Sequence, residues 1–400
     1  MRTLSEDMKR VYLDHIAATP LHPEAREAMR PFLEDRFGNP QSLHALGREA
    51  RAAVDEAREK TAALIGAGAD RIVFTASGSE ANVLAVKGLS LAGGAKKKRI
   101  VVSAVEHVSV LRAAAHLSRY GYSIAHVPVD RQARIDPAAV AEALTDDTVL
   151  VSIQTASSEV GTIQPVEDIA AVCRDRGILF HTDAVAAAGN IPLDVRKIGA
   201  GALSLAADQF YGPKGAAALY LAEGVRLVPL IEGGIQENGR RSGTENVAAL
   251  AGLGRAAEIA AAEMERRTAA MVKLRNRMLA EIPERIPRTI VTGHPEHRLP
   301  HHASFCVEFV EGEAMLLSLD FAGVAASSGS ACASKSLKVS QVLMAMGLDH
   351  ALAQGSLIFS LIDGADDGDI DHLMKVFPPI VEKLRAMSPL YARYIEERRS

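Results

Sequence analysis

The sequence has no tryptophan, and aromatic residues make up only 4% of its 400 residues. Aromatic side chains are the platforms on which bases of single-stranded nucleic acids stack, so such a platform is not indicated. The net charge of -4 at pH 7 also argues against the broad basic surface of a nucleic-acid-binding protein. These two features predict that nucleic acid is not a partner of this chain.

Cysteine is scarce as well, with only Cys173, Cys306 and Cys332 in the chain. Three thiols cannot build a disulfide framework, which favours a reducing compartment, and we expect a cytoplasmic location. Cys173 falls in a predicted helix and Cys306 in a predicted strand, where both are expected to be small core residues. No run of about 18 apolar residues occurs, and residues 1–10 lack the apolar stretch of a secretory signal. We therefore expect no membrane-spanning segment.

Apolar residues make up 48% of the chain and charged residues 24%, which excludes intrinsic disorder. A chain of 400 residues is too long for one hydrophobic core, so two domains are expected. Up to about residue 245, short apolar stretches alternate with amphipathic helical stretches. This alternation predicts an α/β domain with a mostly parallel sheet. Its strands are predicted at residues 71–75, 99–104, 123–128, 148–154, 178–182, 202–206 and 216–221.

The pattern changes after about residue 245, where a long helix is predicted over residues 246–281. The segments beyond it alternate less regularly and predict a smaller α+β domain. We therefore divide the chain into a large α/β domain over residues 19–262 and a small domain that combines residues 1–18 with 263–400. In the small domain, strands are predicted at 288–291, 304–310 and 356–362, and helices at 312–322, at 341–346 and from Asp367 onward.

Four short motifs carry most of the functional information. They are YLDHIAATP at 12–20, FGNPQSLH at 37–44, RRSGTEN at 240–246 and SSGSAC at 327–332. In this order and spacing they resemble the NifS/IscS-type cysteine desulfurases of the class V aminotransferase superfamily, which have the fold-type I architecture of pyridoxal phosphate enzymes. The resemblance covers about residues 12–361. It implies a homodimer, and a large domain with a mostly parallel, seven-stranded sheet.

Enzymes of that group use pyridoxal phosphate, which forms an imine with a lysine and then with the substrate cysteine. A cysteine of the enzyme attacks the substrate sulfur and keeps it as a persulfide. By the resemblance, Cys332 is this catalytic cysteine, and His107 stacks on the cofactor ring and handles protons. Asp183 matches the partner of the pyridine nitrogen. Ser79 and, from a partner subunit, Thr244 match ligands of the phosphate.

The chain departs from this pattern at the position of the imine lysine. The group has SxHK followed by YGPKG, whereas this chain has Ala206, Asp208 and Gln209 in place of the serine, histidine and lysine. The amide nitrogen of glutamine is neither a nucleophile nor a useful base. Asp208 would place a carboxylate near a dianionic phosphate, and like charges repel. Lys214 matches the second lysine, which does not form the imine, and its use in place of the first stays an alternative.

Three further positions of the group are replaced. Ile358 stands where an arginine grips the substrate carboxylate, and it cannot form a bidentate, charge-assisted pair. Ala186 replaces a glutamine near the phenolic oxygen of the cofactor. Ser158 replaces an asparagine that contacts its ring. Because cofactor and substrate groups are lost together, we expect pyridoxal phosphate to be absent or weakly held and ordinary desulfuration not to occur.

These features lead to one main hypothesis about function. The chain is a desulfurase-like protein of sulfur or iron–sulfur cluster metabolism that acts through Cys332. It serves as a persulfide carrier, as a cluster-holding subunit, or as a partner of an iron–sulfur scaffold or sulfur acceptor protein. Cys332 with Asp208, and with His107 nearby, is a candidate metal or cluster site. Two alternatives stay open: an enzyme that binds pyridoxal phosphate and works without the lysine, and a structural or regulatory binding protein.

Overall fold

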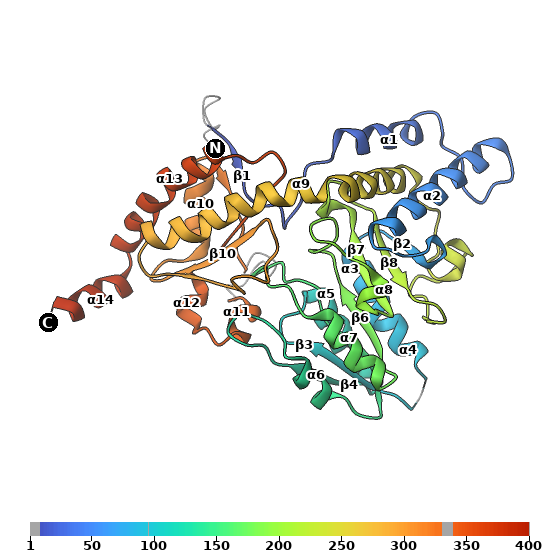
Figure 1. Ribbon diagram of the computed structural model, residues 1–400, viewed down its shortest axis with the longest axis horizontal. Coiled ribbons are helices and arrows are strands. Elements are labelled where there is room, and N and C mark those ends of the chain that lie inside the picture. Colours follow the sequence, from blue (N-terminus) through green and yellow to red (C-terminus); the bar gives the residue numbers. More distant parts are fainter. Residues whose placement is uncertain (1–8, 95, 330–338, 400) are drawn as a thin grey trace.

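A seven-stranded sheet lies at the centre of the larger part of this computed structural model, which describes residues 9–94, 96–329 and 339–399 (Figure 1). Five of its strands are parallel, and β8 runs antiparallel to both of its neighbours, β7 and β2. The predicted strands are confirmed, with ends that differ by at most two residues. In sheet order the strands are β2 (Ile72–Thr75), β8 (Ala217–Leu221), β7 (Ala202–Ala206), β6 (Leu179–Asp183), β5 (Thr148–Ser152), β3 (Arg99–Ser103) and β4 (Ser123–Val127).

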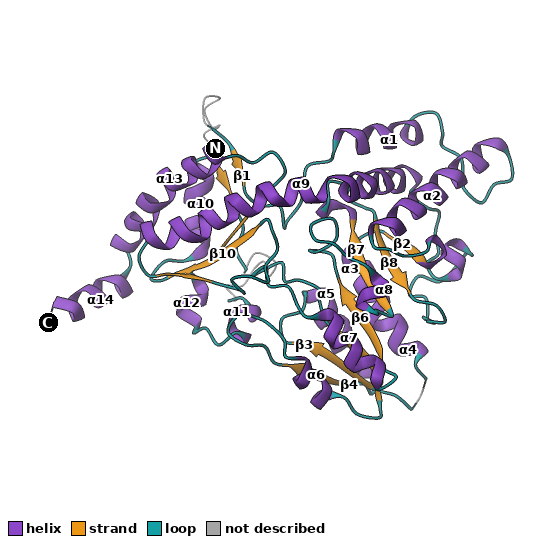
Figure 2. Ribbon diagram, in the orientation of Figure 1, coloured by secondary structure: helices purple, strands orange, loops and turns teal. Residues whose placement is uncertain are grey.

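Helices cover both faces of this sheet (Figure 2). The inner strands β5, β7 and β8 are therefore buried along their whole length, which explains why they are continuously apolar rather than alternating. One face packs against α2 (Ala45–Leu64), α6 (Pro137–Ala143), α7 (Val166–Asp175) and α8 (Val195–Ile198). The other face packs against α3 (Gly78–Val83), a π-helical turn (Leu84–Leu89), α4 (Ser90–Ala92) and α5 (Val108–Leu117).

A single helix of 39 residues, α9 (Val247–Arg285), links the two parts of the molecule. Its first half packs on the large sheet together with α1 (Pro23–Leu33), and its second half enters a separate apolar cluster. The predicted division at residue 262 falls inside this helix and stays a prediction. Among the described residues no helix, α9 included, combines the length and the apolar character that crossing a membrane requires.

The second cluster organises the smaller part of the molecule. Here β1 (Val11–Tyr12) pairs in parallel with β11 (Val324–Ala325), so the start of the chain joins its last third. A three-stranded antiparallel sheet lies beside this pair, in the order β12 (Ser356–Ser360), β10 (His302–Val307), β9 (Thr289–Val291). The surrounding helices are α10 (Gly312–Phe321), α11 (Gln341–Ala345), α12 (His350–Gln354), α13 (Asp367–Ala386) and α14 (Pro389–Arg399).

A buried ion pair fixes the loop that precedes α9. Glu237 has a positive φ of 48° and is almost fully buried. Its carboxylate accepts two hydrogen bonds of 2.7 Å from the Arg58 guanidinium and one of 2.8 Å from the Phe74 backbone N–H. The pair thereby ties the loop to both α2 and β2.

Replacing Glu237 with alanine is expected to lower the free energy of unfolding by about 3–5 kcal/mol, because it leaves the largely buried Arg58 guanidinium without its counter-charge and the buried Phe74 N–H without an acceptor. Urea denaturation measures this loss. Glu223→Ala is the control, since that side chain is 89% exposed, and a change within about 0.5 kcal/mol is expected there. Equal losses in the two variants would show that the buried pair is not what stabilises the loop.

Candidate functional site

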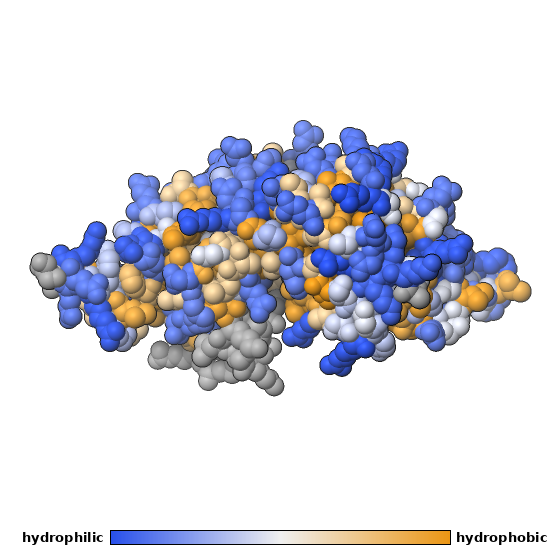
Figure 3. Space-filling model, turned by 90° about the horizontal axis from the view of Figure 1, so that it is seen from below, coloured by the Kyte–Doolittle hydropathy of each residue, from blue (hydrophilic) through white to orange (hydrophobic). Residues whose placement is uncertain are grey.

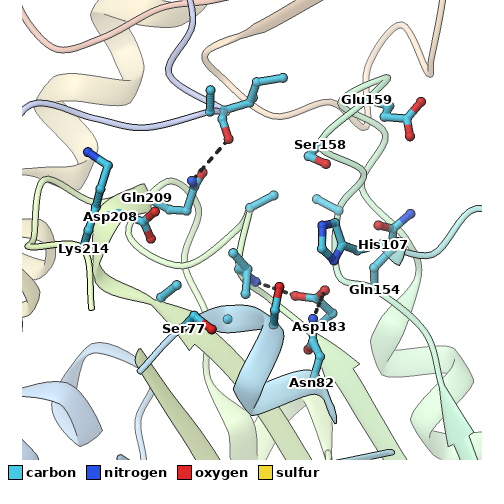
Figure 4. Close-up of a pocket in the computed structure, with 18 of the residues that line it drawn as sticks. Ser77, Asn82, His107, Gln154, Ser158, Glu159, Asp183, Asp208, Gln209 and Lys214 are labelled. Carbon is cyan, nitrogen blue, oxygen red and sulfur yellow. Dashed lines mark hydrogen bonds between the residues drawn. The ribbon is translucent and has the colours of Figure 1, made fainter. Parts of the chain in front are cut away.

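A pocket of about 590 Å³ lies at the carboxyl ends of the central strands. Ligands of α/β proteins bind at this edge, because the loops that follow parallel strands meet there. Asp183 ends β6, Ala206 ends β7, and His107 follows β3 directly before α5. Figure 4 shows these elements around the pocket, with the start of α3 on one side.

A row of hydrogen bonds joins the two acid–base groups predicted for this site. The Asn82 amide donates to Asp183 Oδ2 at 2.6 Å and to Ser109 Oγ at 3.1 Å. Ser109 Oγ lies 2.7 Å from His107 Nδ1, which also accepts from the Ser109 backbone N–H at 3.2 Å. Because a backbone N–H can only donate, Nδ1 is an acceptor. The proton of a neutral His107 therefore sits on Nε2.

Asn82 and Ser109 were not predicted from the sequence. Asn82 lies three residues after Ser79, on the same face of the helix, and it is buried where the helix pattern calls for an apolar residue. A buried asparagine at that spacing is the signal that could have identified it. Its Oδ1 accepts no hydrogen bond in the described part of the structure.

Two buried acids lie around His107. Burial raises the pKa of Asp183, against hydrogen bonds from Val185 N–H and Asn82 that favour its charged form. Burial also raises the pKa of Glu106 to about 8, although its Oε1 accepts from Ser103 Oγ at 2.5 Å and from the Gln154 backbone N–H at 3.0 Å. A low-dielectric environment thus favours neutral carboxyls behind this side of the pocket.

Gln209, which the resemblance places at the position of the imine lysine, lines the pocket and is buried. Its side-chain amide donates to the Ile16 carbonyl at 3.3 Å, and its backbone carbonyl oxygen lies 3.0 Å from His15 Nε2. Lys214 lines the pocket beside Asp208, and burial raises the pKa of Asp208 although the lysine charge opposes this shift. In Figure 4 these two residues lie on the side opposite His107.

The part of the pocket next to α3 offers few groups for a phosphate. Ser77 is engaged as the N-cap of α3, where its hydroxyl accepts from Glu80 N–H at 3.1 Å, whereas Ser79 is exposed and lines the pocket. Ala206 faces Gly78, since a Cβ built on that glycine would lie 3.4 Å from the alanine methyl group. With a methyl group, a carboxylate and an amide, positions 206, 208 and 209 supply neither an amine nor a hydroxyl or imidazole donor for pyridoxal phosphate. Lys214 also lines the pocket, and its use as the imine lysine stays a prediction.

Some of the remaining predicted residues line the pocket and others do not. Ala186, Ser158 and Ile358 line the pocket, as the resemblance implied. Thr244 is exposed and is not part of the lining formed by its own chain, so a role through a second copy stays a prediction. Cys332 lies outside the described residues. Among the described residues no group of three histidine, cysteine, aspartate or glutamate side chains could hold a metal ion, and the pairing of Cys332 with Asp208 stays a prediction.

Glu159 connects the pocket to the chain on either side of residues 330–338. Its Oε2 accepts from Ser340 Oγ at 2.5 Å, and a Cβ built on Gly329 would lie 2.8 Å from the same oxygen. Burial raises the pKa of Glu159 to about 7. Glu159 was not predicted from the sequence as a site residue. The described ends of the Cys332 segment therefore meet at the pocket.

Stability is expected to fall as the pH rises from 6.5 to 8. In the folded protein the pKa is about 8 for Glu106 and about 7 for Glu159, against 4.5 for an ordinary glutamate. The stability that these two groups contribute is fully present below pH 4.5, and it is lost as the pH rises through the two folded-state pKa values. Histidines with lowered pKa values, such as His15 at about 4, change the pH dependence of stability only below about pH 6.5. Glu106→Gln should flatten the slope by up to about 1.4 kcal/mol per pH unit in urea titrations. An unchanged slope would contradict this assignment.

Comparison with known proteins identifies the protein family to which this chain belongs. The Aminotransferase class-V family matches residues 11–373, so the chain belongs to that family. Within it, the chain is 45% identical to the cysteine desulfurase IscS of Dictyoglomus turgidum over 96% of this chain and 97% of that protein. It is 42% identical to the cysteine desulfurase NifS of Azotobacter vinelandii over 96% of each chain.

A solved structure of a NifS-like protein superposes with a TM-score of 0.88 at 33% identity, and covers 94% of this chain and all of the other. The fold-type I architecture and the resemblance inferred from the four motifs are thereby confirmed.

Proposed function

We propose that this chain is a desulfurase-like protein of sulfur or iron–sulfur cluster metabolism that carries sulfur as a persulfide on Cys332 and does not itself release sulfur from cysteine. The observation that carries the proposal is the hydrogen bond made by the Gln209 side chain. Its amide binds the Ile16 carbonyl at the place where the related enzymes have a reactive amine.

The other residues that replace family residues at the pocket support the same proposal. Ala206 and Asp208 remove donors for a phosphate, and Ile358 removes the cation for a substrate carboxylate. By the resemblance, Asp183, His107 and the SSGSAC motif around Cys332 are kept. A protein that receives sulfur instead of producing it needs only the kept parts.

The proposed step is a transfer between thiols. The Cys332 thiolate attacks the outer sulfur of a donor persulfide, R–S–SH, and a sulfur–sulfur bond forms on Cys332. The sulfur–sulfur bond of the donor breaks, and the donor leaves as its thiolate, R–S⁻. The numbers of atoms and electrons are conserved, so the step needs no oxidant or reductant. The product is passed on to an acceptor thiol, such as that of an iron–sulfur scaffold protein, in the same way.

Anaerobically purified protein tests this function directly. We expect no alanine from added cysteine and pyridoxal phosphate, no cofactor absorbance that persists through gel filtration, and uptake of about one sulfane sulfur per chain from a small-molecule persulfide. Alanine release at a rate above that of free pyridoxal phosphate would overturn the proposal. Labile iron that is bound in place of sulfane sulfur would assign the chain to cluster holding instead.

A further inference from the structure

A second pocket, of about 500 Å³, lies at the end of the molecule that carries the C-terminus. It is bounded by the end of α9 and by α13 and α14 (Figure 1). At this end of the molecule Figure 3 shows apolar atoms among strongly hydrophilic ones. Its charged lining residues are Arg285, Arg288, Arg385, Arg398 and Glu382, and the apolar and aromatic ones are Ile286, Pro287, Pro378, Pro379, Val381, Tyr391, Tyr394 and Ile395.

Packed aromatic rings hold α14 in place and contribute to one wall of this pocket. The Phe309 ring lies 5.1 Å from the Tyr394 ring and 5.6 Å from the Tyr391 ring. The Arg288 guanidinium covers Tyr394 at 4.5 Å, and its charge is paired with Glu308 through a hydrogen bond of 2.7 Å. Arg288 is therefore part of the wall and is not available to a ligand.

Arg385 lines the pocket, and its hydrogen-bonding capacity is not fully used. The residue is only 7% exposed, and its Nε donates to the Glu308 carbonyl at 3.2 Å. Its Nη2 is shielded from solvent and has no hydrogen-bond partner in the described part of the structure. A buried guanidinium N–H without an acceptor is costly, so an acceptor from outside the chain would be bound favourably.

Arg398 supplies the second cation. Its guanidinium lies 5.4 Å from the centre of the Tyr394 ring, and no carboxylate of the described residues forms an ion pair with it. Arg285 is paired with Glu281. One buried guanidinium with an unpaired Nη2 and one exposed guanidinium thus line the same pocket as proline, isoleucine and tyrosine side chains.

We propose that this pocket binds a small organic anion, with a carboxylate or phosphate head on Arg385 and Arg398 and an apolar or aromatic body against Pro378, Pro379 and Ile395. Guanidinium groups pair with both heads in a bidentate manner. The volume lies within the range of about 300–1,000 Å³ that is usual for small-molecule sites. The proposal is independent of the function assigned to the pocket beside Gln209.

Isothermal titration calorimetry on the full-length chain tests the site with phenyl phosphate, benzoate, inorganic phosphate and phenol. We expect one of the two aromatic anions to bind more tightly than inorganic phosphate, and phenol not to bind. The stronger of the two identifies the head group. Arg398→Glu should lower the affinity for that anion by about tenfold or more, because a charge-assisted contact becomes a repulsive one.

Arg393→Glu is the matched control, because Arg393 is an exposed residue of the same helix outside the lining. It should leave the affinity within about twofold, since the charge change is the same but the contact is not made. Arg385→Met should abolish binding, and if that variant does not fold, Arg398→Glu still decides the question. Absence of binding by both aromatic anions, equal weakening by the two glutamate variants, or binding of phenol as tight as that of the anions would each overturn the proposal.

Discussion

Replacing Cys332 with serine is expected to remove all of the sulfane sulfur that the chain accepts from a small-molecule persulfide. Only a thiolate attacks a persulfide, and burial raises the pKa of both Cys173 and Cys306 to about 12. At neutral pH these two thiols are protonated and shielded from the donor. Cyanolysis of the desalted protein measures the bound sulfur, with about one per chain expected in the unmodified protein and none in the variant.

Cys173→Ala and Cys306→Ala are the controls for this measurement. Both side chains are fully buried in apolar clusters, so these variants should keep the full amount of sulfane sulfur even where they lose some stability. Sulfur that persists in Cys332→Ser, or that disappears in either alanine variant, would show that Cys332 is not the carrier.

The sheet and the long helix could be predicted from the sequence because their signals are local. Buried parallel strands are continuously apolar, and α9 repeats an apolar face over many turns. The helix predicted from Asp367 onward is two helices, and α14 was not predicted as a separate one, since it is polar and lacks a clear apolar face. It is held by Tyr391 and Tyr394 against Phe309, which lies far back in the sequence. Such tertiary contacts leave no local pattern.

In the candidate site, too, local motifs could be predicted from the sequence and tertiary contacts could not. The motifs identified His107 and Asp183, and the structure brings both to one pocket. The link between them was not predictable, because Asn82 is 27 residues from Ser109 and 101 residues from Asp183. Nor does a sequence reveal how far burial raises the pKa of Glu106 or Glu159, since that shift depends on the dielectric environment of the folded protein.

Restoring three side chains is expected to convert the pocket into one that holds pyridoxal phosphate. The triple variant Ala206→Ser, Asp208→His, Gln209→Lys should bind the cofactor at least about 100-fold more tightly than Gln209→Lys alone, as measured by absorbance titration and gel filtration. The lysine supplies an amine, but the carboxylate of Asp208 still repels a dianionic phosphate. Removing that charge and adding two donors supplies contacts worth about 1.5–3 kcal/mol each.

The control is the same triple variant with Gln209→Met, which keeps the two phosphate donors and lacks the amine. It should bind pyridoxal phosphate only reversibly, whereas the lysine variant should keep it through gel filtration. Neither variant should release alanine from cysteine, because Ile358, which by the resemblance replaces the arginine for the substrate carboxylate, lines the pocket and supplies no cation. Ile358→Arg added to the lysine variant separates substrate binding from cofactor binding. If the unmodified chain held pyridoxal phosphate as firmly as the triple variant, then Ala206, Asp208 and Gln209 would not be the cause of its loss, and the persulfide-carrier proposal would have to be abandoned.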